Sequence, residues 1–363
     1  MAIYDYQGNA ISGAGGDVTD EQIRNAFLRA VIDGTIVVGT SIGDSLGIDT
    51  HNFNETYMQT AYNSLLTAYK EHPNSIPFFI HTDQHGRGLE IQRYANNIDV
   101  DGMEYVNINC GDTVVDTYGS TVLEEAYQRV KYVKNYIGIV GNHEHKPSST
   151  ENPEKYLIRK TFGTTNLERR MITTDDVDCY IAYQPVHGVK FMCLDLYTSY
   201  ISTGSSPNTT SETTEWIIKE LSRDDGYDIV LLMHEPTLLT YKTRTATEYS
   251  TRTQNANMVN LFNLFLARKN KTSGTYTAAD STSHDYDFSN ASNELLCMLS
   301  GHWHQELYSD RDGFTVYVQD WAGGNRYGGS FGLIDRESNL LRIFSFDNLN
   351  GNYSELDISL QLT

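Results

Sequence analysis

Side chains of the kind that bind metal ions recur in this chain of 363 residues, each time directly after an apolar run. The segment MLSGHWHQEL, residues 298–307, has two histidines on either side of a tryptophan, and similar positions occur in TDQHG, CGDT, GNHE and LMHEP. The predicted metal ligands are Asp83, His85, Asp112, Asn142, His234, His302 and His304. Three oxygen donors and four imidazoles suit Mn, Fe, Zn, Co or Ni, and the set is too rich in nitrogen for Ca or Mg alone.

The spacing inside two of these segments indicates how the ligands converge. In an extended segment, side chains two residues apart point in the same direction. Asp83 and His85 are therefore expected to face one metal ion. The two histidines of GHWH are expected to share one side of the chain and to reach two metal ions, with Trp303 facing away. Glycines precede three of the ligand segments and allow tight backbone there: Gly111, Gly141 and Gly301.

The apolar runs predict the strands of an α/β fold. Residues 76–85, 104–112 and 136–144 each form an apolar run that turns polar at its end, with an amphipathic helix predicted over 120–135. Open α/β sheets bind ligands beyond the carboxyl ends of their strands, which is where these polar residues lie. Further strands are predicted within 179–198, 227–236, 293–304, 314–320 and 331–347, and helices over 53–72, 211–223 and 257–268.

One polar segment, residues 237–293, is predicted to be a long insertion on the substrate side of the fold or a lid. It contains the helix 257–268 and then a Thr/Ser/Asn-rich stretch for which the sequence predicts no structure. Loops of such length in compact enzymes are usually functional.

The motif order DxH, GD, GNHE, a lone His and GHxH, over about residues 76–335, resembles the calcineurin-like metallophosphoesterase superfamily. The resemblance implies a four-layer αββα sandwich of two mixed β-sheets. It also implies two metal ions per chain, with Asp112 bridging them. The first ion would be bound by Asp83, His85, Asp112 and His304, and the second by Asp112, Asn142, His234 and His302.

The same resemblance implies a reaction. His143 would bind no metal and would act beside the phosphate as a general acid or transition-state donor. The substrate would be a phosphate ester, hydrolysed by a metal-activated water. Phosphodiesters are favoured over monoesters, because no cluster of basic residues is evident to bind a dianion. Glu144 is either an orienting partner of His143 or a solvent-exposed residue.

The chain departs from the family pattern at one position. Many relatives carry a second aspartate three residues after the GD aspartate, where this chain has Val115, which argues against a phosphoprotein-phosphatase subclass. Arg87 and Arg326 are the two candidates for binding phosphate, and the alternative for each is a solvated loop charge. His81 and His145 flank the motifs and are expected to be supporting or incidental residues.

Two other functions are alternatives. The Asn/Thr/Tyr-rich composition and acidic charge would suit a virion or cell-surface structural or adhesive protein that contains a phosphoesterase-type domain. The segment Gly43-Asp44-Ser45-Leu46 resembles the nucleophile block of GDSL esterases. Those enzymes need a late Asp-x-x-His, and no histidine follows His304, so the esterase is the more remote alternative.

Composition restricts the partners and the setting. A formal net charge of −20 argues against broad binding of DNA or RNA, which needs a basic surface. The sequence shows neither a signal peptide nor an apolar run that could span a bilayer, so a cytoplasmic protein without a membrane partner is expected, with a virion-associated one as the alternative. The four cysteines are expected to be buried free thiols, and no oligomeric state is predicted. Residues 1–75 are expected to form an N-terminal extension that packs on or precedes a catalytic domain of residues 76–363.

Overall fold

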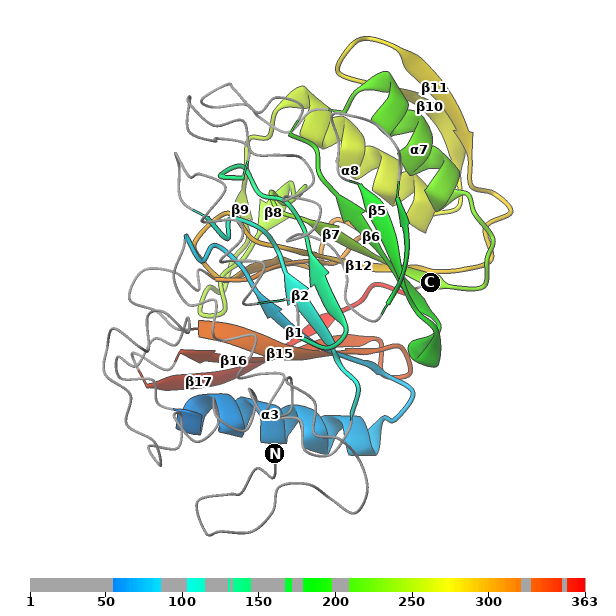
Figure 1. Cartoon of the computed structure of the whole chain (residues 1–363). Coiled ribbons are helices and arrows are strands. Elements are labelled where there is room, and N and C mark those ends of the chain that lie inside the picture. Colours follow the sequence, from blue (N-terminus) through cyan, green and yellow to red (C-terminus); the bar gives the residue numbers. More distant parts are fainter. Residues whose placement is uncertain are drawn as a thin grey trace, which may run out of the picture. The chain divides into compact units, whose positions relative to one another are not determined.

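Two β-sheets lie face to face between layers of helix (Figure 1). The computed structural model describes residues 55–85, 103–114, 130, 133–144, 167–171, 179–197, 209–320, 328–347 and 351–362. One sheet has six strands in the order β17-β16-β15-β1-β2-β3, and the other has seven in the order β13-β14-β12-β7-β6-β5-β4. Both sheets contain parallel and antiparallel pairs, so both are mixed.

The six-stranded sheet is covered on its outer face by the helix α3, Glu55–Glu71, which contacts β15, β16 and β17. The helix ends two residues before Pro73, as the sequence predicted, because a proline cannot continue the helical hydrogen bonds. The strands are β1 Ile76–His81, β2 Val106–Asn109, β3 Tyr136–Gly138, β15 Gly328–Asp335, β16 Leu340–Asp347 and β17 Asn352–Ser359.

The seven-stranded sheet carries two helices on its outer face, α7 (Ser211–Leu221) and α8 (Ala256–Lys269). Each begins at a side-chain cap: Thr210 accepts a hydrogen bond from the Thr213 N–H, and Asn255 accepts one from the Met258 N–H. The strands are β4 Glu168–Met171, β5 Tyr180–Gln184, β6 Val189–Leu194, β7 Asp228–Met233, β12 Leu295–Ser300, β13 Leu307–Ser309 and β14 Val316–Val318. A 3-10 turn, Pro185–His187, joins β5 to β6 and ends at Gly188, whose φ of 60° is left-handed.

The sequence of strand β7 is apolar throughout because both of its faces are buried. Ile229 and Leu231 face the cluster formed with α7 and α8, whereas Val230 and Leu232 face the cluster between the two sheets. A strand that is buried on both faces needs apolar residues at every position instead of alternation. The four layers are therefore helix, sheet, sheet and helix, which confirms the predicted αββα sandwich.

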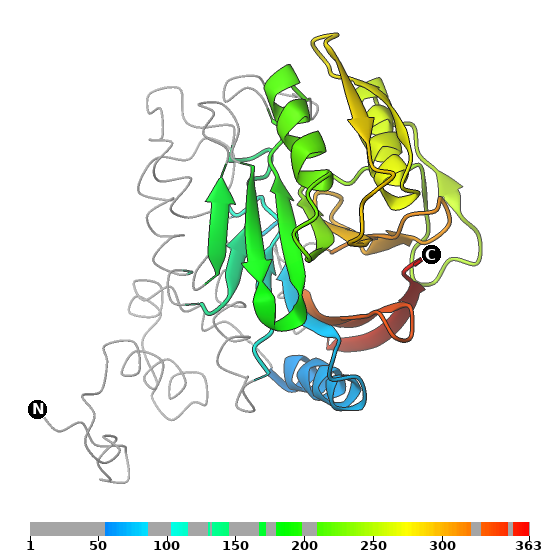
Figure 2. The same ribbon diagram turned by 90° about the vertical axis from the view of Figure 1, so that its right-hand side faces the viewer.

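The segment 237–293, predicted from the sequence to be an insertion, is more structured than expected. The helix predicted over 257–268 is α8, but the polar residues after it form a hairpin of β10 (Ser273–Thr277) and β11 (Ser283–Asp287). The hairpin packs on α7 and α8 (Figure 2). A second small hairpin pairs β8 (Thr240–Tyr241) with β9 (Ser250–Thr251). The expectation of an unstructured stretch was therefore wrong, because short polar strands lack the apolar signal that predicts them.

Several sequence expectations lie outside the described residues: the segment 43–46, almost all of the helix 120–135, Val115, Arg87, His145 and Arg326. The compact unit that contains all described residues begins at Phe53, so α3 belongs to it, and the division at residue 75 stays a prediction. The four cysteines are buried and form no disulfide with one another, as expected. Among the described residues, no helix combines the length and apolar character needed to cross a membrane.

Candidate metal centre

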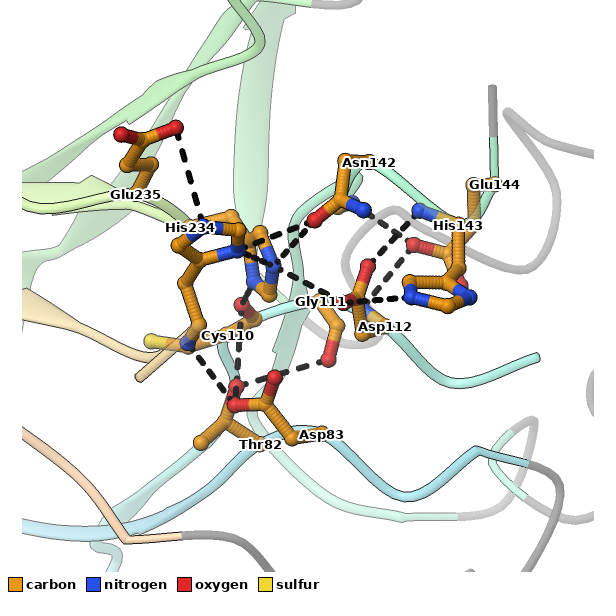
Figure 3. Close-up of polar contacts among 12 residues, drawn as sticks. Thr82, Asp83, Cys110, Gly111, Asp112, Asn142, His143, Glu144, His234 and Glu235 are labelled. Atoms are coloured by element: carbon orange, nitrogen blue, oxygen red, sulfur yellow. Dashed lines mark hydrogen bonds and ion pairs between the residues drawn. The ribbon is translucent and has the colours of Figure 1, made fainter. Parts of the chain in front are cut away.

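The predicted ligands all follow strands whose carboxyl ends meet at one place. Asp83 and His85 follow β1, Asp112 follows β2 and Asn142 follows β3. His234 follows β7 of the other sheet, and His302 and His304 follow β12. Because β1, β2 and β3 run parallel, and β7 runs parallel to β12, each sheet delivers its polar residues at one edge. The structure thus brings all seven predicted residues together, three from the second sheet and four from the first. Figure 3 shows four of them, Asp83, Asp112, Asn142 and His234.

Four of these side chains direct an oxygen or nitrogen atom at one common point. They are Asp112, Asn142, His234 and His302. Nε2 of His234 lies 3.1 Å from Oδ2 of Asp112, 3.2 Å from Oδ1 of Asn142 and 3.2 Å from Nδ1 of His302. Nδ1 of His302 is also 3.0 Å from Oδ1 of Asn142. Ligand atoms about 2.1 Å from one metal ion, at right angles to one another, would be about 3.0 Å apart. The spacing therefore fits a shared metal ion.

A second cluster lies beside the first and contains Asp83, His85 and His304. Nε2 of His304 is 3.2 Å from Oδ1 of Asp83 and 3.2 Å from Nε2 of His85. The Asp83 side chain is completely buried, and among the described residues its Oδ1 has no possible hydrogen-bond donor other than Nε2 of His304. Its other oxygen accepts hydrogen bonds of 2.8 Å from the Thr82 hydroxyl and of 2.8 Å from the His302 N–H. One oxygen is thus oriented by the protein and the other is left for a cation.

The hydrogen bonds of His234 show that its cluster requires positive charge. Nδ1 of His234 is 2.6 Å from the carbonyl oxygen of Cys110, and a carbonyl only accepts, so Nδ1 carries a hydrogen. In a neutral imidazole the lone pair is then on Nε2, where it faces the oxygens of Asn142 and Asp112. Acceptors that face one another in a buried site are stable only with a cation between them, either a proton or a metal ion.

The pKa values in this cluster follow from the same geometry. Burial would lower the pKa of His234, but the Asp112 carboxylate outweighs burial and raises the pKa of His234 to about 10. Burial likewise opposes charge on Asp112, yet His234 and then His143 hold the pKa of Asp112 well below its usual range. Burial and the neighbouring His234 lower the pKa of His302 to about 4. A metal ion that binds both imidazoles would therefore have to displace a proton from His234 but not from His302.

The ligands converge by a different backbone geometry from the one expected. The φ angle is 53° at Asp83, 48° at His85, 77° at His302 and 52° at His304. The backbone at these four residues is left-handed rather than extended. The expectation that each pair faces one side because its segment is extended was therefore wrong, although the side chains do come together. Trp303 packs with the core cluster around α8, apart from the converging ligand atoms, as expected.

Glu144 is fully buried and holds two of the ligand loops together. Its carboxylate accepts hydrogen bonds from the N–H groups of Asp112 at 3.0 Å, Val114 at 3.0 Å and Gly141 at 2.6 Å. The solvent-exposed alternative for Glu144 is therefore wrong, and its observed contacts fix backbone. Burial and then the Asp112 carboxylate raise the pKa of Glu144 to about 7, whereas the backbone N–H groups oppose that rise.

Two glycines allow these loops to approach each other. Gly111 has a φ of 92°, and a Cβ atom there would lie 2.8 Å from the backbone nitrogen of Gly141. A Cβ atom on Gly141 would overlap the Asp112 carboxylate in turn. Both positions therefore require glycine, as the sequence predicted.

His143 lies beside Asp112 with its side chain partly exposed. Its backbone N–H donates to Oδ1 of Asp112 at 2.8 Å, and its Nε2 is 3.7 Å from Oδ2 of the same residue. Its ring centre is 4.4 Å from that of His85. The side chain is 22% exposed, so it can contact a molecule that enters from solvent. The geometry also permits His143 to join His85 and Asp112 around a cation.

Sequence reasoning missed two residues near the site. Glu235, in LMHEP, lies with Oε2 3.8 Å from Nε2 of His302, and Arg252 lies with Nη2 3.7 Å from Oε1 of Glu235. Glu235 directly follows the predicted ligand His234, and this position is the sequence signal that could have identified it. Arg252 lies in the insertion, 18 residues further on, and nothing in its sequence context indicates the contact. His81 is fully buried and contacts Gln84, so it is a supporting residue.

Comparison with known proteins gives likeness in structure but not in sequence. No family model matches the chain, and no curated protein matches it. A predicted phosphoesterase from Streptococcus pneumoniae is 9% identical, with 78% of this chain and 98% of that chain covered and a TM-score of 0.31. A putative 5'-nucleotidase from Staphylococcus aureus is 12% identical, with 79% and 54% covered and a TM-score of 0.38, so the likeness spans about half of that protein.

A third solved structure, a phosphopantetheinyl hydrolase from Mycobacterium tuberculosis, is 13% identical, with 68% of this chain and 90% of that chain covered and a TM-score of 0.35. These structures are described as phosphoesterase, nucleotidase and hydrolase. Because their TM-scores are all below 0.5, the function of the site is argued below from its own geometry.

Proposed function

We propose that this protein is an enzyme that hydrolyses phosphate esters at a centre of two metal ions. The observation that carries the proposal is the convergence of acceptor atoms from Asp112, Asn142, His234 and His302, at 3.0 to 3.2 Å, on a point that requires a cation. The cluster of Asp83, His85 and His304 would hold the other ion. Asp112 would lie between both, because it belongs to one group with His85 and to another with His234.

When bound, two cations would neutralise the charge of a phosphoryl group and lower the pKa of a water molecule. The protein's own residues would orient the Asp112 carboxylate and donate a proton or a hydrogen bond to the substrate. The backbone N–H of His143 holds Oδ1 of Asp112 in a fixed direction. His143 would donate a proton from its imidazole to the leaving oxygen, or a hydrogen bond to the phosphoryl group, because it is exposed and lies beside the proposed ions.

The proposed substrate is a phosphodiester rather than a monoester. A monoester is a dianion and needs more positive charge than a diester. Two arginines of the insertion are already engaged by acidic residues: Arg244 forms hydrogen bonds of 2.7 Å with both carboxylate oxygens of Glu306, and Arg252 pairs with Glu235. The metal ions would then supply the main charge for the substrate, which matches the single negative charge of a diester. Mn²⁺ is the proposed ion to test first, because a mixed set of oxygen and imidazole ligands suits it.

The test is hydrolysis of bis-p-nitrophenyl phosphate and p-nitrophenyl phosphate by the purified protein. With Mn²⁺ added, we expect turnover of the diester to exceed that of the monoester, and we expect EDTA to abolish both. Faster turnover of the monoester would overturn the preference but not the reaction class. If neither compound is hydrolysed with Mn²⁺, Fe²⁺, Zn²⁺, Co²⁺ or Ni²⁺, the proposed function is wrong.

A further inference from the structure

The imidazole of His302 has a different partner at each of its two nitrogens. Nδ1 faces the metal site, at 3.0 Å from Oδ1 of Asn142 and 3.2 Å from Nε2 of His234. Nε2 points the other way, toward Oε2 of Glu235 at 3.8 Å. The function of the ring depends on which nitrogen carries the hydrogen, because only a bare Nδ1 can bind a metal ion.

Glu235 is itself held on two sides. The hydroxyl of the buried Tyr197 donates a hydrogen bond to Oε2 of Glu235 at 3.4 Å, and Nη2 of Arg252 lies 3.7 Å from Oε1. The Glu235 side chain is only 14% exposed. A carboxylate in this position is costly unless a cation accompanies it, and Arg252 supplies that charge.

Arg252 connects the insertion to the metal-binding segment. It follows β9, and its backbone N–H donates to the Leu239 carbonyl at 2.9 Å. Its guanidinium carbon lies 3.2 Å from the centre of the Trp303 ring, a cation–π contact. Trp303 also packs edge-on against Tyr241 of β8, with ring centres 5.6 Å apart. The small β8–β9 hairpin thus supports the tryptophan that stands between His302 and His304.

We propose that Glu235 is a positioning residue whose carboxylate, 3.8 Å from Nε2 of His302, electrostatically favours the hydrogen on that nitrogen, and that Arg252 holds Glu235 in place through its stack on Trp303. Histidines that bind metals usually donate their other N–H to a carboxylate or carbonyl, which fixes the tautomer and the ring. His234 already shows this arrangement with the Cys110 carbonyl. The inference rests on the proposed metal centre. It assigns the insertion a supporting role at the second ion instead of that of a lid.

The test measures metal binding rather than turnover. Mn²⁺ is titrated into the metal-depleted full chain by calorimetry, with wild type, Glu235→Ala, Glu235→Gln and the control Glu248→Ala compared; Glu248 is an exposed glutamate of the same insertion. We expect Glu235→Ala to weaken one of the two Mn²⁺ sites about 10- to 100-fold and to leave the other unchanged. Glu235→Gln should weaken the same site less, because its amide oxygen still carries a partial negative charge. Glu248→Ala should match wild type.

A double-mutant cycle tests the part of Arg252. Arg252→Ala should weaken the same Mn²⁺ site in the wild-type background and have no further effect in the Glu235→Ala background, because its effect passes through Glu235. An equal effect in both backgrounds would overturn the role of Arg252. Nitrogen-15 spectra of the Zn²⁺-loaded protein should show His302 with its hydrogen on Nε2.

Two outcomes separate this inference from the proposed function. If wild type and Glu235→Ala both bind two ions with equal affinity, Glu235 does not position His302, while the metal centre stands. If wild type binds no Mn²⁺ or Zn²⁺, the metal centre itself fails. Should Glu235→Ala not fold, Glu235→Ser decides, because its side chain is polar but too short to reach Nε2 of His302: Mn²⁺ affinity equal to wild type at both sites would overturn the inference.

Discussion

Five of the seven proposed metal ligands stand on left-handed backbone, a conformation that residues other than glycine rarely adopt. The positive φ angles are those of Asp83, His85, Asp112, His302 and His304, between 48° and 77°. Such conformations persist where the surrounding structure imposes them, and they are concentrated at functional sites. The sequence predicted which residues converge, because each follows an apolar run. It could not predict how, because the φ of a single residue depends on loops that are far apart in the chain.

At the residue scale, His143 is the position where ligand and catalytic roles can be separated. For His143→Ala we expect turnover to fall about 10²- to 10⁴-fold, the usual contribution of a general acid. Metal content, measured by elemental analysis, should stay at two ions per chain. Loss of an ion along with activity would show that His143 is a ligand, which its place beside His85 and Asp112 also permits.

Glu144 provides a second prediction at this scale. Replacing it by glutamine presents an amide N–H₂ to backbone N–H groups that now donate to a carboxylate, so at least one bond is lost. We expect Glu144→Gln to lower the free energy of unfolding by about 1 to 3 kcal/mol, the cost of an unsatisfied buried group. Chemical denaturation measures it. The control is Glu215→Gln, because Glu215 is exposed. If both variants have the same free energy of unfolding, Glu144 does not hold the two ligand loops together.

At the element scale, the predictable parts were those whose burial shows in the sequence. The runs that became β1, β7 and β12 are buried along nearly their whole length and end in polar ligands. By contrast, the β10–β11 hairpin is largely exposed and β17 is mostly half-buried, and their polar sequences resemble loops. What forms these strands is pairing with a neighbour, such as that of β17 with β16, which a single sequence does not display.

Asp335 ties the end of α3 to the β15–β16 turn, and it gives a pH-dependent prediction. Its Oδ1 accepts hydrogen bonds from the N–H groups of Glu337 and Ser338, each 3.1 Å long, and its Oδ2 lies 3.2 Å from Nδ1 of His72. Burial would raise the pKa of Asp335, but the bonds from Ser338 and the charge of His72 outweigh it and lower the pKa below the ordinary 3.8. A lowered pKa stabilises the fold above pH 3.8, and this contribution is lost as pH falls through the lowered value.

We therefore expect Asp335→Asn to cost about 1 to 2 kcal/mol of unfolding free energy at pH 7. The difference from wild type should shrink below pH 3.8, as the carboxyl becomes protonated first in the unfolded chain and then, at the lowered pKa, in the folded protein. Asp357→Asn is the matched control, because Asp357 is half exposed and pairs with Arg342 at 3.3 Å on the same sheet. Unfolding curves from pH 2 to pH 8 provide the measurement, and a difference that grows toward low pH would contradict the account.

At the scale of the whole molecule, the proposed centre joins the two sheets. Its oxygen ligands come from the ends of β1, β2 and β3, and three of its four imidazoles come from the ends of β7 and β12. Ions bound there would link residues more than 200 positions apart, such as Asp83 and His304. The sequence indicated this arrangement only through the order of its motifs, since neither sheet alone contains a complete ligand set.

Metal removal should accordingly lower the stability of the whole fold. A ligand at 100 times its Kd stabilises the folded state by about 2.7 kcal/mol. We expect the Tm of the Mn²⁺-loaded protein to drop by several degrees after treatment with EDTA and to return when Mn²⁺ is added in excess. Differential scanning calorimetry measures this, with Mg²⁺ as the comparison ion. A Tm that does not respond to EDTA or Mn²⁺ would show that the sheets are not linked by metal.

The central claim, two cations held between the sheets, is tested most directly by anomalous diffraction from crystals grown with Mn²⁺. The account predicts two anomalous peaks, one among Asp83, His85 and His304 and the other among Asn142, His234 and His302, with Asp112 between them. A structure of the Mn²⁺-loaded protein with no peak at these residues, or with peaks only elsewhere, would contradict it.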